Sequence, residues 1–244
     1  MEKYRLAGRL ALVTGASRGI GRAASLALAQ AGAHVIIAAR RVRALEALDD
    51  EIRALGGAAT LVQLDLTAGE KLDVLGPTIY DRWGKLDIFV ACAAILGPLS
   101  PLPHISADAW STVLSTNIDA NWRLIRSLDP LLRKSDAGRA IFVTCGAARQ
   151  QRAYWGAYAV SKAALEALAR TYAAEVVNTS VKVNLLDPGP TATELRAQAY
   201  PGETPTALTQ PVDIQPLFLK LADTELVEHG ELFAYESPIS NERV

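Results

Sequence analysis

The segment Leu10-Ala-Leu-Val-Thr-Gly-Ala-Ser-Arg-Gly-Ile-Gly-Arg22 decides the fold class of this chain. Its first four residues form a short apolar run, which is typical of a strand buried on both faces. From Gly19 onward the apolar residues recur at helical spacing, so the sequence predicts a strand, a tight turn and a helix. Such a turn leaves the first backbone N–H groups of the helix unpaired, beyond the end of the strand.

The turn has the chemistry of an anion-binding site. Its glycines follow the spacing G-x-x-x-G-x-G, which keeps side chains away from the backbone, and a helix N-terminus favours negative charge. A nearby hydroxyl and a cation strengthen the prediction. The residues assigned to a dinucleotide pyrophosphate are Gly15, Ser17, Arg18, Gly19, Ile20 and Gly21. A tight turn also needs glycine for steric reasons alone, so the turn does not establish the function by itself.

Strand and helix patterns alternate along the rest of the chain. Further strands are expected at 34–39, 59–64, 86–90, 139–145, 181–186 and 231–235. Helices are expected at 42–55, 71–83, 107–133 with a bend near Asn117, 155–177 and 213–222. Consecutive β-α units with short connections predict an α/β fold, a Rossmann-like doubly wound parallel sheet. We expect one domain over residues 1–244, in which the proline-rich segment 190–212 forms a mobile flap over the substrate.

Composition excludes several classes of partner. The 244 residues include 25 basic and 26 acidic side chains, and these are scattered, so neither a nucleic-acid surface nor a polybasic membrane anchor is expected. No apolar run approaches the ~20 residues that span a bilayer. Both cysteines, Cys92 and Cys145, are expected to be reduced, and the chain leads directly into its first strand. These features predict a cytoplasmic protein, and no metal site is assigned.

The strand ends indicate the cofactor. An NAD-binding fold usually has a carboxylate after its second strand, but here Arg40 occupies that region. A cation suits the 2′-phosphate of NADP, so NADP is predicted and NAD remains possible. Arg40 is equally explained as a solvated residue at a helix start. Asp65, after the third strand, is assigned to the adenine amino group, although it would also serve as a helix N-cap.

The chemistry is predicted to depend on Tyr158 and Lys162. Four residues apart on a helix, they share one face. A phenol with a pKa near ~10 is a poor proton donor or acceptor at neutral pH, and a neighbouring ammonium lowers that pKa. The phenol would then exchange a proton with a substrate oxygen. A tyrosine and a lysine at this spacing also occur by chance on many helices.

Four motifs in this order resemble the short-chain dehydrogenase/reductase family: Thr14–Gly21, Asn117, Tyr158-Ala-Val-Ser-Lys162 and Pro188–Thr193. The resemblance covers essentially the whole chain. It implies seven strands, one dinucleotide site and a small carbonyl or alcohol substrate, in a homodimer or homotetramer. It makes Tyr158 the general acid/base, and Lys162 the group that binds the nicotinamide ribose and tunes the tyrosine. Asn117 would hold a water molecule in the proton relay.

The resemblance also completes the cofactor site. The motif after the sixth strand would cover the nicotinamide, and positions after the third and fourth strands would line the same site. The residues assigned in this way are Leu66, Ala93, Pro188, Gly189, Thr191 and Thr193.

Two departures from the family pattern are visible. The usual Asn-Asn-Ala-Gly after the fourth strand is replaced by Ala91-Cys92-Ala93-Ala94, which removes a polar clasp and predicts a looser cofactor site. The catalytic serine position holds Cys145, and a thiol is a weak hydrogen-bond donor. Losing such a donor costs on the order of 3 kcal/mol of transition-state stabilisation. Alternation along the strand points Thr144 to the other side, and Cys145 is also explained as a buried, unreactive thiol.

Two functions remain open at this point. One is an NADP-dependent oxidoreductase acting on a carbonyl or secondary alcohol, with Asn117, Cys145, Tyr158 and Lys162 in its catalytic set. The other is an NADP-binding scaffold or sensor with little turnover. The substrate cannot be identified, but apolar candidates for its pocket, each also explained as ordinary core, are Leu96, Pro98, Tyr154, Trp155 and Tyr200.

Overall fold

In the computed structural model, which describes residues 6–150 and 152–236, seven parallel strands form one sheet in the order β3-β2-β1-β4-β5-β6-β7. The predicted doubly wound parallel sheet is therefore confirmed. The strands are β1 (Leu10–Thr14), β2 (His34–Ala39), β3 (Ala58–Gln63), β4 (Ile88–Ala91), β5 (Arg139–Val143), β6 (Lys182–Asp187) and β7 (Leu232–Ala234).

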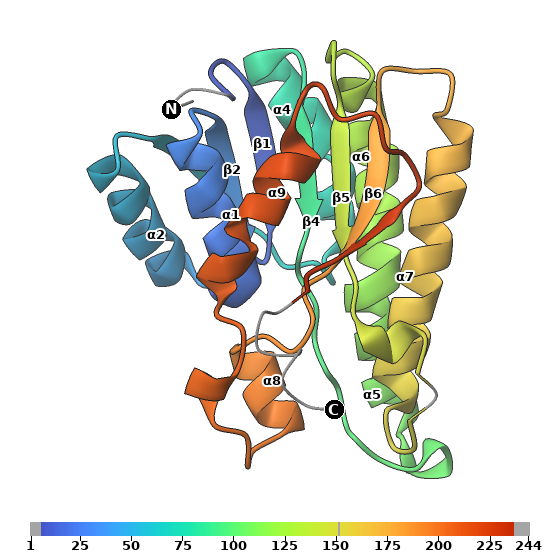
Figure 1. Cartoon of the computed structure of the whole chain (residues 1–244). Coiled ribbons are helices and arrows are strands. Elements are labelled where there is room, and N and C mark those ends of the chain that lie inside the picture. Colours follow the sequence, from blue (N-terminus) through green and yellow to red (C-terminus); the bar gives the residue numbers. More distant parts are fainter. Residues whose placement is uncertain (1–5, 151, 237–244) are drawn as a thin grey trace.

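Helices cover both faces of the sheet (Figure 1). On one face lie α1 (Gly19–Gln30), α2 (Val42–Ala54) and α9 (Gln215–Ala222). On the other lie α4 (Leu75–Trp83), α6 (Ala120–Leu132) and α7 (Gly156–Glu175). The shorter helices α3 (Gly69–Asp73) and α5 (Ala107–Leu114) pack against α6 and α7, respectively. No helix among the described residues is long and apolar enough to cross a membrane.

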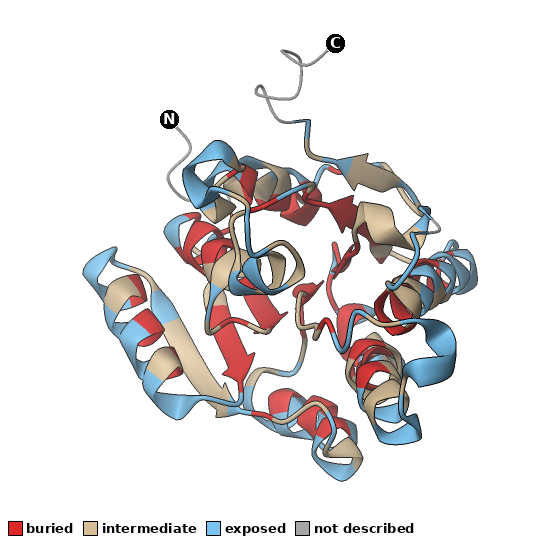
Figure 2. Cartoon of the chain, turned by 90° about the horizontal axis from the view of Figure 1, so that it is seen from below, coloured by how far each residue is buried: buried red, intermediate tan, exposed pale blue. Residues whose placement is uncertain are grey.

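The central strands β1 and β4 are almost wholly apolar because each of their faces packs into a separate core. In β1, Ala11 and Val13 face the α1 side, whereas Leu10 and Leu12 face the α6 side. Figure 2, which looks onto the carboxyl edge of the sheet, shows the buried central strands between helices whose outer surfaces are exposed. Burial on both sides removes the alternation of polar and apolar residues that a half-exposed strand would show.

The order of the strands creates a crevice at the carboxyl edge. From β1 the chain proceeds to β2 and β3 on one side, and from β4 onward to the strands on the other side. The connections that follow β1 and β4 therefore diverge. In open α/β sheets this is the place where ligands bind.

Most element boundaries agree with the prediction to within two residues, and three segments differ by more than that. The helix predicted at 107–133 contains a π-helical turn, Ser115–Asp119, which buries Asn117 at the expected bend. The helix predicted at 71–83 is two helices that meet at Val74. The segment 190–212 contains the short helix α8 (Glu194–Ala199) and a 3₁₀ turn at Pro205–Ala207, both too short to show a period in the sequence. Its mobility stays a prediction.

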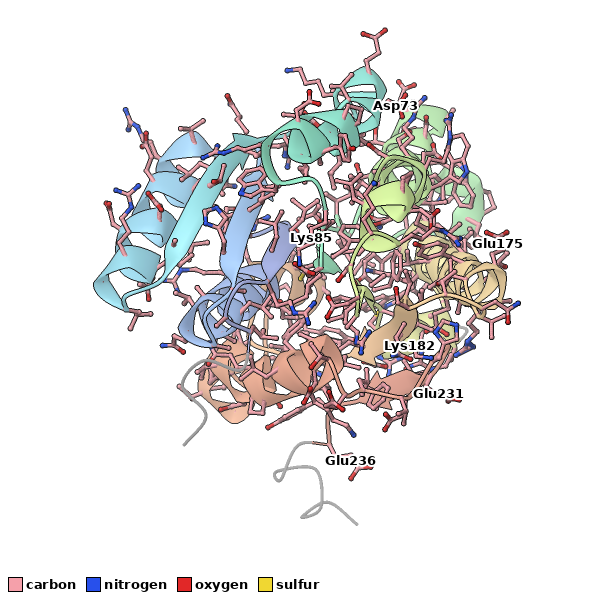
Figure 3. All side chains as sticks on the ribbon, turned by 90° about the horizontal axis from the view of Figure 1, so that it is seen from above. Asp73, Lys85, Glu175, Lys182, Glu231 and Glu236 are labelled. Atoms are coloured by element: carbon pink, nitrogen blue, oxygen red, sulfur yellow. The ribbon has the colours of Figure 1, made fainter. Side chains whose placement is uncertain are left out.

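The amino edge of the sheet is joined by one buried carboxylate, Asp87, whose side chain is 0% exposed. It accepts hydrogen bonds from the backbone N–H of Leu10 at 2.8 Å and from Ser135 Oγ at 2.6 Å. Lys85 Nζ lies 2.8 Å and Arg9 Nη1 3.1 Å from the same carboxylate. Figure 3 looks onto this edge and shows Lys85 near the centre of the view. Asp87 thereby links the starts of β1, β4 and β5.

Burial alone would raise the pKa of Asp87, but the hydrogen bonds from Lys85 and Ser135 outweigh it and hold the pKa below its usual 3.8. A lowered pKa in the folded state stabilises the protein above pH ~4 and loses that effect as pH falls through the folded value. Asp87→Ala should therefore lower the free energy of unfolding by about 3 kcal/mol at pH 7. Urea unfolding at pH 7 and at pH 3 should show this difference shrinking in acid.

The exposed Asp50 on α2 provides the matched control. Asp50→Ala should change the free energy of unfolding by less than about 0.5 kcal/mol. Equal effects of the two substitutions would contradict the role given to Asp87.

Candidate active site

A cavity of about 480 Å³ lies at the carboxyl edge of the sheet, within the size range of small-molecule sites. All of the candidate catalytic and cofactor-binding residues line it, with one exception, Asn117. The tertiary structure therefore brings together residues that lie up to about 180 positions apart in the chain, from Gly15 to Thr193. One end is formed by the turn after β1, and the other by α7 and the loop after β6.

Glycine is required in the turn after β1 by close contacts. A Cβ atom at Gly15 would lie 2.8 Å from Ala93 Cα, and a Cβ at Gly21 would lie 2.4 Å from the carbonyl oxygen of Gly15. Gly19 has a φ of +54°, which side-chain-bearing residues rarely adopt, and its missing Cβ would lie 3.2 Å from Thr193 Cγ2. The first two glycines thus allow segments of backbone to pack closely. Gly19 also allows Thr193, the N-cap of α8, to lie close to the turn.

The N-terminus of α1 is open to an anion. Its N-cap is Arg18, whose side chain makes no capping hydrogen bond, and no acidic residue lies in the first turn. The first backbone N–H groups of the helix therefore have no side-chain partner of the kind that usually satisfies them. Together with the helix dipole, this arrangement suits a phosphate.

Cations converge on the same end of the cavity. Burial lowers the pKa of Arg18, and the neighbouring charges of Arg41 and Arg40 lower it further. Arg18, Arg40 and Arg41 all line the cavity, so their positive charges act on the same region of it. Arg18 also forms an ion pair with Glu194 at the start of α8, and both side chains are about half exposed.

Asp65 lines the cavity but does not cap a helix. Its Oδ1 atom accepts hydrogen bonds from the backbone N–H of Thr67 at 2.9 Å and from its hydroxyl at 2.8 Å. These two hydrogen bonds lower the pKa of Asp65. The N-cap of α3 is Ala68, so the N-cap interpretation of Asp65 was wrong. The carboxylate instead stabilises the turn that follows β3, in which Leu66 lies between Asp65 and Thr67.

The helix α7 presents Tyr158 and Lys162 on one buried face, as the spacing predicts. Tyr158 is 6% exposed and Lys162 is 3% exposed. The Nζ atom of Lys162 donates a hydrogen bond to the carbonyl oxygen of Val143 at 2.8 Å and lies 5.9 Å from the centroid of the Tyr158 ring. The thiol of Cys145 donates to the phenol oxygen of Tyr158 at 3.7 Å. The residue at the serine position therefore faces the phenol.

Burial governs the ionisation of this pair. It raises the pKa of the Tyr158 phenol well above 10, with a smaller contribution from Cys145, and it lowers the pKa of Lys162. The phenol shift is opposite to the one expected from the sequence. The reason is that both side chains are buried and that the amine of Lys162 donates a hydrogen bond to a backbone carbonyl. Tyr158 is therefore protonated at neutral pH, and burial by itself makes its phenol a weaker acid than an exposed one.

Asn117 lies outside the cavity and contacts two of the segments that form it. Its Oδ1 accepts from the backbone N–H of Ile95 at 2.9 Å, and its Nδ2 donates to the carbonyl of Ile95 at 3.0 Å and to Ser161 Oγ at 2.9 Å. The amide thus joins the loop after β4 to α7 and does not reach the cavity. Its role in holding a water molecule stays a prediction.

The model of the short chain dehydrogenase family matches residues 9–204. This chain belongs to the short-chain dehydrogenase family. It is 38% identical to the uncharacterized oxidoreductase YciK of Escherichia coli K12 over 216 residues, which cover 87% of this chain and 85% of that protein.

Two solved structures of the family are also similar. A short chain dehydrogenase from Shigella flexneri 2a, crystallised with NADP, gives a TM-score of 0.91 at 37% identity over 95% of this chain and 98% of that one. A short chain dehydrogenase from Escherichia coli CFT073, crystallised with NADPH, gives 0.89 at 36% identity over 96% and 99%.

In this short-chain dehydrogenase the hydroxyl of Thr14 connects β1 to the loop after β4, where the asparagines of the family motif are missing. The hydroxyl of Thr14 accepts from the backbone N–H groups of Cys92 at 3.2 Å and Ala93 at 3.5 Å, and donates to the carbonyl of Val90 at 3.4 Å. Burial raises the pKa of Cys92 to about 12, so this thiol is protonated. β1 and the loop after β4 are therefore still joined by side-chain hydrogen bonds.

The motif after β6 is held by its own hydroxyl groups. Thr191 Oγ1 donates to the carbonyl of Pro188 at 3.1 Å, and Thr193 caps α8 by accepting from the backbone N–H of Arg196 at 3.2 Å. Gly189 has a φ of +65° and donates its N–H to Asp187 at 3.0 Å. The motif thus forms a compact cover at the inner end of the cavity.

An ion network beneath the site was missed by the sequence analysis. Arg149 pairs with Glu166 on α7 and with Asp187 at the end of β6, and Thr144 Oγ1 donates to Glu166 at 2.8 Å. Glu166 lies four residues after Lys162, so helical spacing gave a signal for it. Nothing in the sequence marked Arg149, because its two partners come from other elements.

The substrate candidates divide into two groups. Trp155 and Tyr200 line the cavity, as predicted, and their ring centroids lie 5.6 Å apart. Leu96, Pro98 and Tyr154 do not line it; Leu96 is buried and Tyr154 is 60% exposed. The aromatic wall is therefore formed by the start of α7 and the end of α8.

Arg149→Met should lower the free energy of unfolding by about 2 kcal/mol, because it removes the cation shared by two carboxylates that are each about 90% buried. Of the cations among the described residues, Glu166 then keeps only the longer contact with Arg170, at 3.9 Å. Arg149→Lys should lower the free energy of unfolding by less, because lysine keeps the positive charge but lacks the second nitrogen that lets a guanidinium contact both carboxylates. Chemical unfolding at pH 7 measures both variants. A change below about 0.5 kcal/mol in Arg149→Met would show that the network contributes nothing.

Proposed function

We propose that this short-chain dehydrogenase is an NADP(H)-dependent oxidoreductase that interconverts a carbonyl compound and a secondary alcohol. The observation that carries the proposal is the buried pair Tyr158 and Lys162 at one end of a cavity whose other end is lined by arginines. A protein that only binds a nucleotide has no need for a buried phenol and amine beside the ligand.

The cofactor site fits NADP on observations of this chain. The uncapped N-terminus of α1 suits the pyrophosphate, and the converging arginines suit the 2′-phosphate. The relatives crystallised with NADP and NADPH support the same choice. We assign the pyrophosphate to Gly15, Ser17, Arg18, Gly19, Ile20 and Gly21, and the adenosine half to Arg40, Asp65 and Leu66. The nicotinamide half is assigned to Ala93, Tyr158, Lys162, Pro188, Gly189, Thr191 and Thr193.

When bound, NADPH supplies the hydride that reduces the carbonyl carbon. Tyr158, protonated at neutral pH, donates its proton to the carbonyl oxygen. The charge of Lys162 stabilises the phenolate that remains until solvent returns the proton. Cys145 donates a weak hydrogen bond to the same oxygen. The sum is a carbonyl compound, NADPH and one proton converted to an alcohol and NADP⁺.

A second candidate function is an NADP-binding scaffold or sensor with little turnover. The observation that favours it is Cys145, which faces the phenol with a thiol in place of a hydroxyl. NADPH oxidation with a panel of ketones, aldehydes and quinones separates the two candidates. No turnover despite micromolar cofactor affinity would leave only the scaffold.

Cys145→Ser should raise kcat by about tenfold to a hundredfold, because a hydroxyl donates a stronger hydrogen bond to the developing oxyanion. Tyr158→Phe should abolish turnover and leave NADPH affinity nearly unchanged. Absorbance at the NADPH band and fluorescence titration of the cofactor measure the two quantities. A lower kcat in Cys145→Ser would contradict the donor role of residue 145.

Arg40→Asp should weaken NADPH binding about tenfold to a hundredfold and improve NADH binding, because it removes a cation beside the 2′-phosphate and adds an acceptor for the ribose. Arg43→Asp, an exposed residue on α2 outside the cavity, is the matched control. Titration with both cofactors gives the ratio of affinities. Unchanged selectivity in Arg40→Asp would remove the 2′-phosphate assignment.

A further inference from the structure

We propose that the substrate carries a carboxylate, which Arg152 binds beside the aromatic wall formed by Trp155 and Tyr200. This inference rests on the proposed function, because it names the class of carbonyl compound that enters the same cavity. It assigns a specificity role to a cation that the reaction itself does not use.

Arg152 lies between the 3₁₀ turn Gly146–Ala148 and the start of α7, and it lines the same cavity as Cys145 and Tyr158. The ring of Trp155 bridges the distance to the reacting phenol. Its centroid lies 6.0 Å from that of Tyr158 and 5.6 Å from that of Tyr200. A row of three rings therefore leads from the reaction centre to the helix α8 end of the cavity.

Arg152 differs from the other arginines near this end in having no carboxylate partner among the described residues. Arg196 is held by two hydrogen bonds to Glu203, at 2.6 and 2.5 Å, and its guanidinium lies over the ring of Tyr200. Arg149 is neutralised by its two carboxylates.

Arg152 is exposed, and among the described residues its side chain makes one hydrogen bond, from Nη1 to the hydroxyl of Tyr200 at 2.5 Å. A guanidinium has five N–H donors, so several remain for a ligand. A carboxylate is the group that matches this fork in shape and charge.

The backbone beside Arg152 is held in an uncommon conformation. Tyr154 has a φ of +73°, the single positive value among the described non-glycine residues. Such a conformation is strained for a residue that carries a side chain, and it persists where surrounding contacts impose it. Here Tyr154 O accepts from the backbone N–H of Ser100 at 2.9 Å, and Trp155 N donates to the carbonyl of Arg152. The turn therefore fixes Arg152 and Trp155 relative to each other.

The wall also limits the shape of the substrate. Flat rings on one side favour a planar, apolar body between the carbonyl and the carboxylate, since aromatic faces stack well. A cationic substrate would be repelled by Arg152, and a neutral one would leave its free donors unused. An aromatic or short unsaturated oxo acid fits these constraints.

The test compares 4-carboxybenzaldehyde with its methyl ester, which has the same ring and aldehyde but no charge. Wild-type kcat/KM should be at least about tenfold higher for the acid, mainly through KM, which is the effect of a charged hydrogen bond. Arg152→Met should remove this preference and leave the ester nearly unchanged. Tyr200→Phe, which keeps the ring, should reduce the preference less.

Arg82→Met is the matched control, because Arg82 is an exposed cation at the end of α4, on the opposite edge of the sheet. It should keep the wild-type preference. Equal kcat/KM for acid and ester in the wild type would overturn the inference. An equal loss for both substrates in Arg152→Met would also overturn it, since Arg152 would then only support the cavity wall.

Calorimetric binding of terephthalate to the NADPH-loaded protein separates this inference from the proposed function. Binding by the wild type that is at least about tenfold weaker in Arg152→Met supports the carboxylate site, even where no aldehyde is reduced. Absence of NADPH oxidation with intact terephthalate binding would overturn the oxidoreductase proposal alone. Absence of terephthalate binding, or equal binding by both proteins, would overturn the carboxylate site.

Discussion

The arrangement of the site depends on one close backbone approach, between the turn after β1 and the loop after β4. Gly15 meets Ala93 so closely that a Cβ atom would lie 2.8 Å from the Ala93 Cα. This contact lies where the strand order changes direction, and it sets α1 with its uncapped N-terminus over the edge of the sheet. The hydroxyl of Thr14 joins the same two segments. Every other part of the cavity takes its position from this junction, because parallel strands end at the same edge.

The two ends of the cavity differ in their access to water, and their electrostatics differ for that reason. At the outer end, Arg40 and Arg41 are exposed, and their charges act on Arg18 through solvent and protein together. At the inner end, burial shifts the pKa values of Tyr158 and Lys162 toward their neutral forms. A dry region disfavours any isolated charge. Proton transfer therefore has a protonated phenol as its starting point, and the amine acts on the phenolate only as that charge develops.

Neighbouring arginines in one loop have different surroundings and different consequences. Arg149 pairs with Glu166 and Asp187, which come from α7 and β6, and so it ties together the elements beneath the site. Arg152, three residues later, contacts the hydroxyl of Tyr200 and lines the cavity. The positive φ of Tyr154 separates this part of the loop from the regular helix that follows. In the sequence the two arginines look alike. Their contacts in the structure distinguish Arg149, which pairs with buried carboxylates, from Arg152, which lines the cavity and is proposed to bind the substrate.

Local pattern was sufficient to predict the sheet, the turn after β1, and the pairing of Tyr158 with Lys162. Strand burial, glycine spacing and helical periodicity are properties of neighbouring residues, and they act over one or two turns of chain. The motifs also predicted which strand ends form the cavity, and all of the candidates except Asn117 line it. Tertiary structure decided the rest. The direction of the Tyr158 pKa, the use of the Asn117 amide as a brace, and the partners of Arg149 and Arg152 all depend on burial and on contacts between distant segments. Desolvation and ion pairing arise only when these segments pack together, so no local pattern carries them.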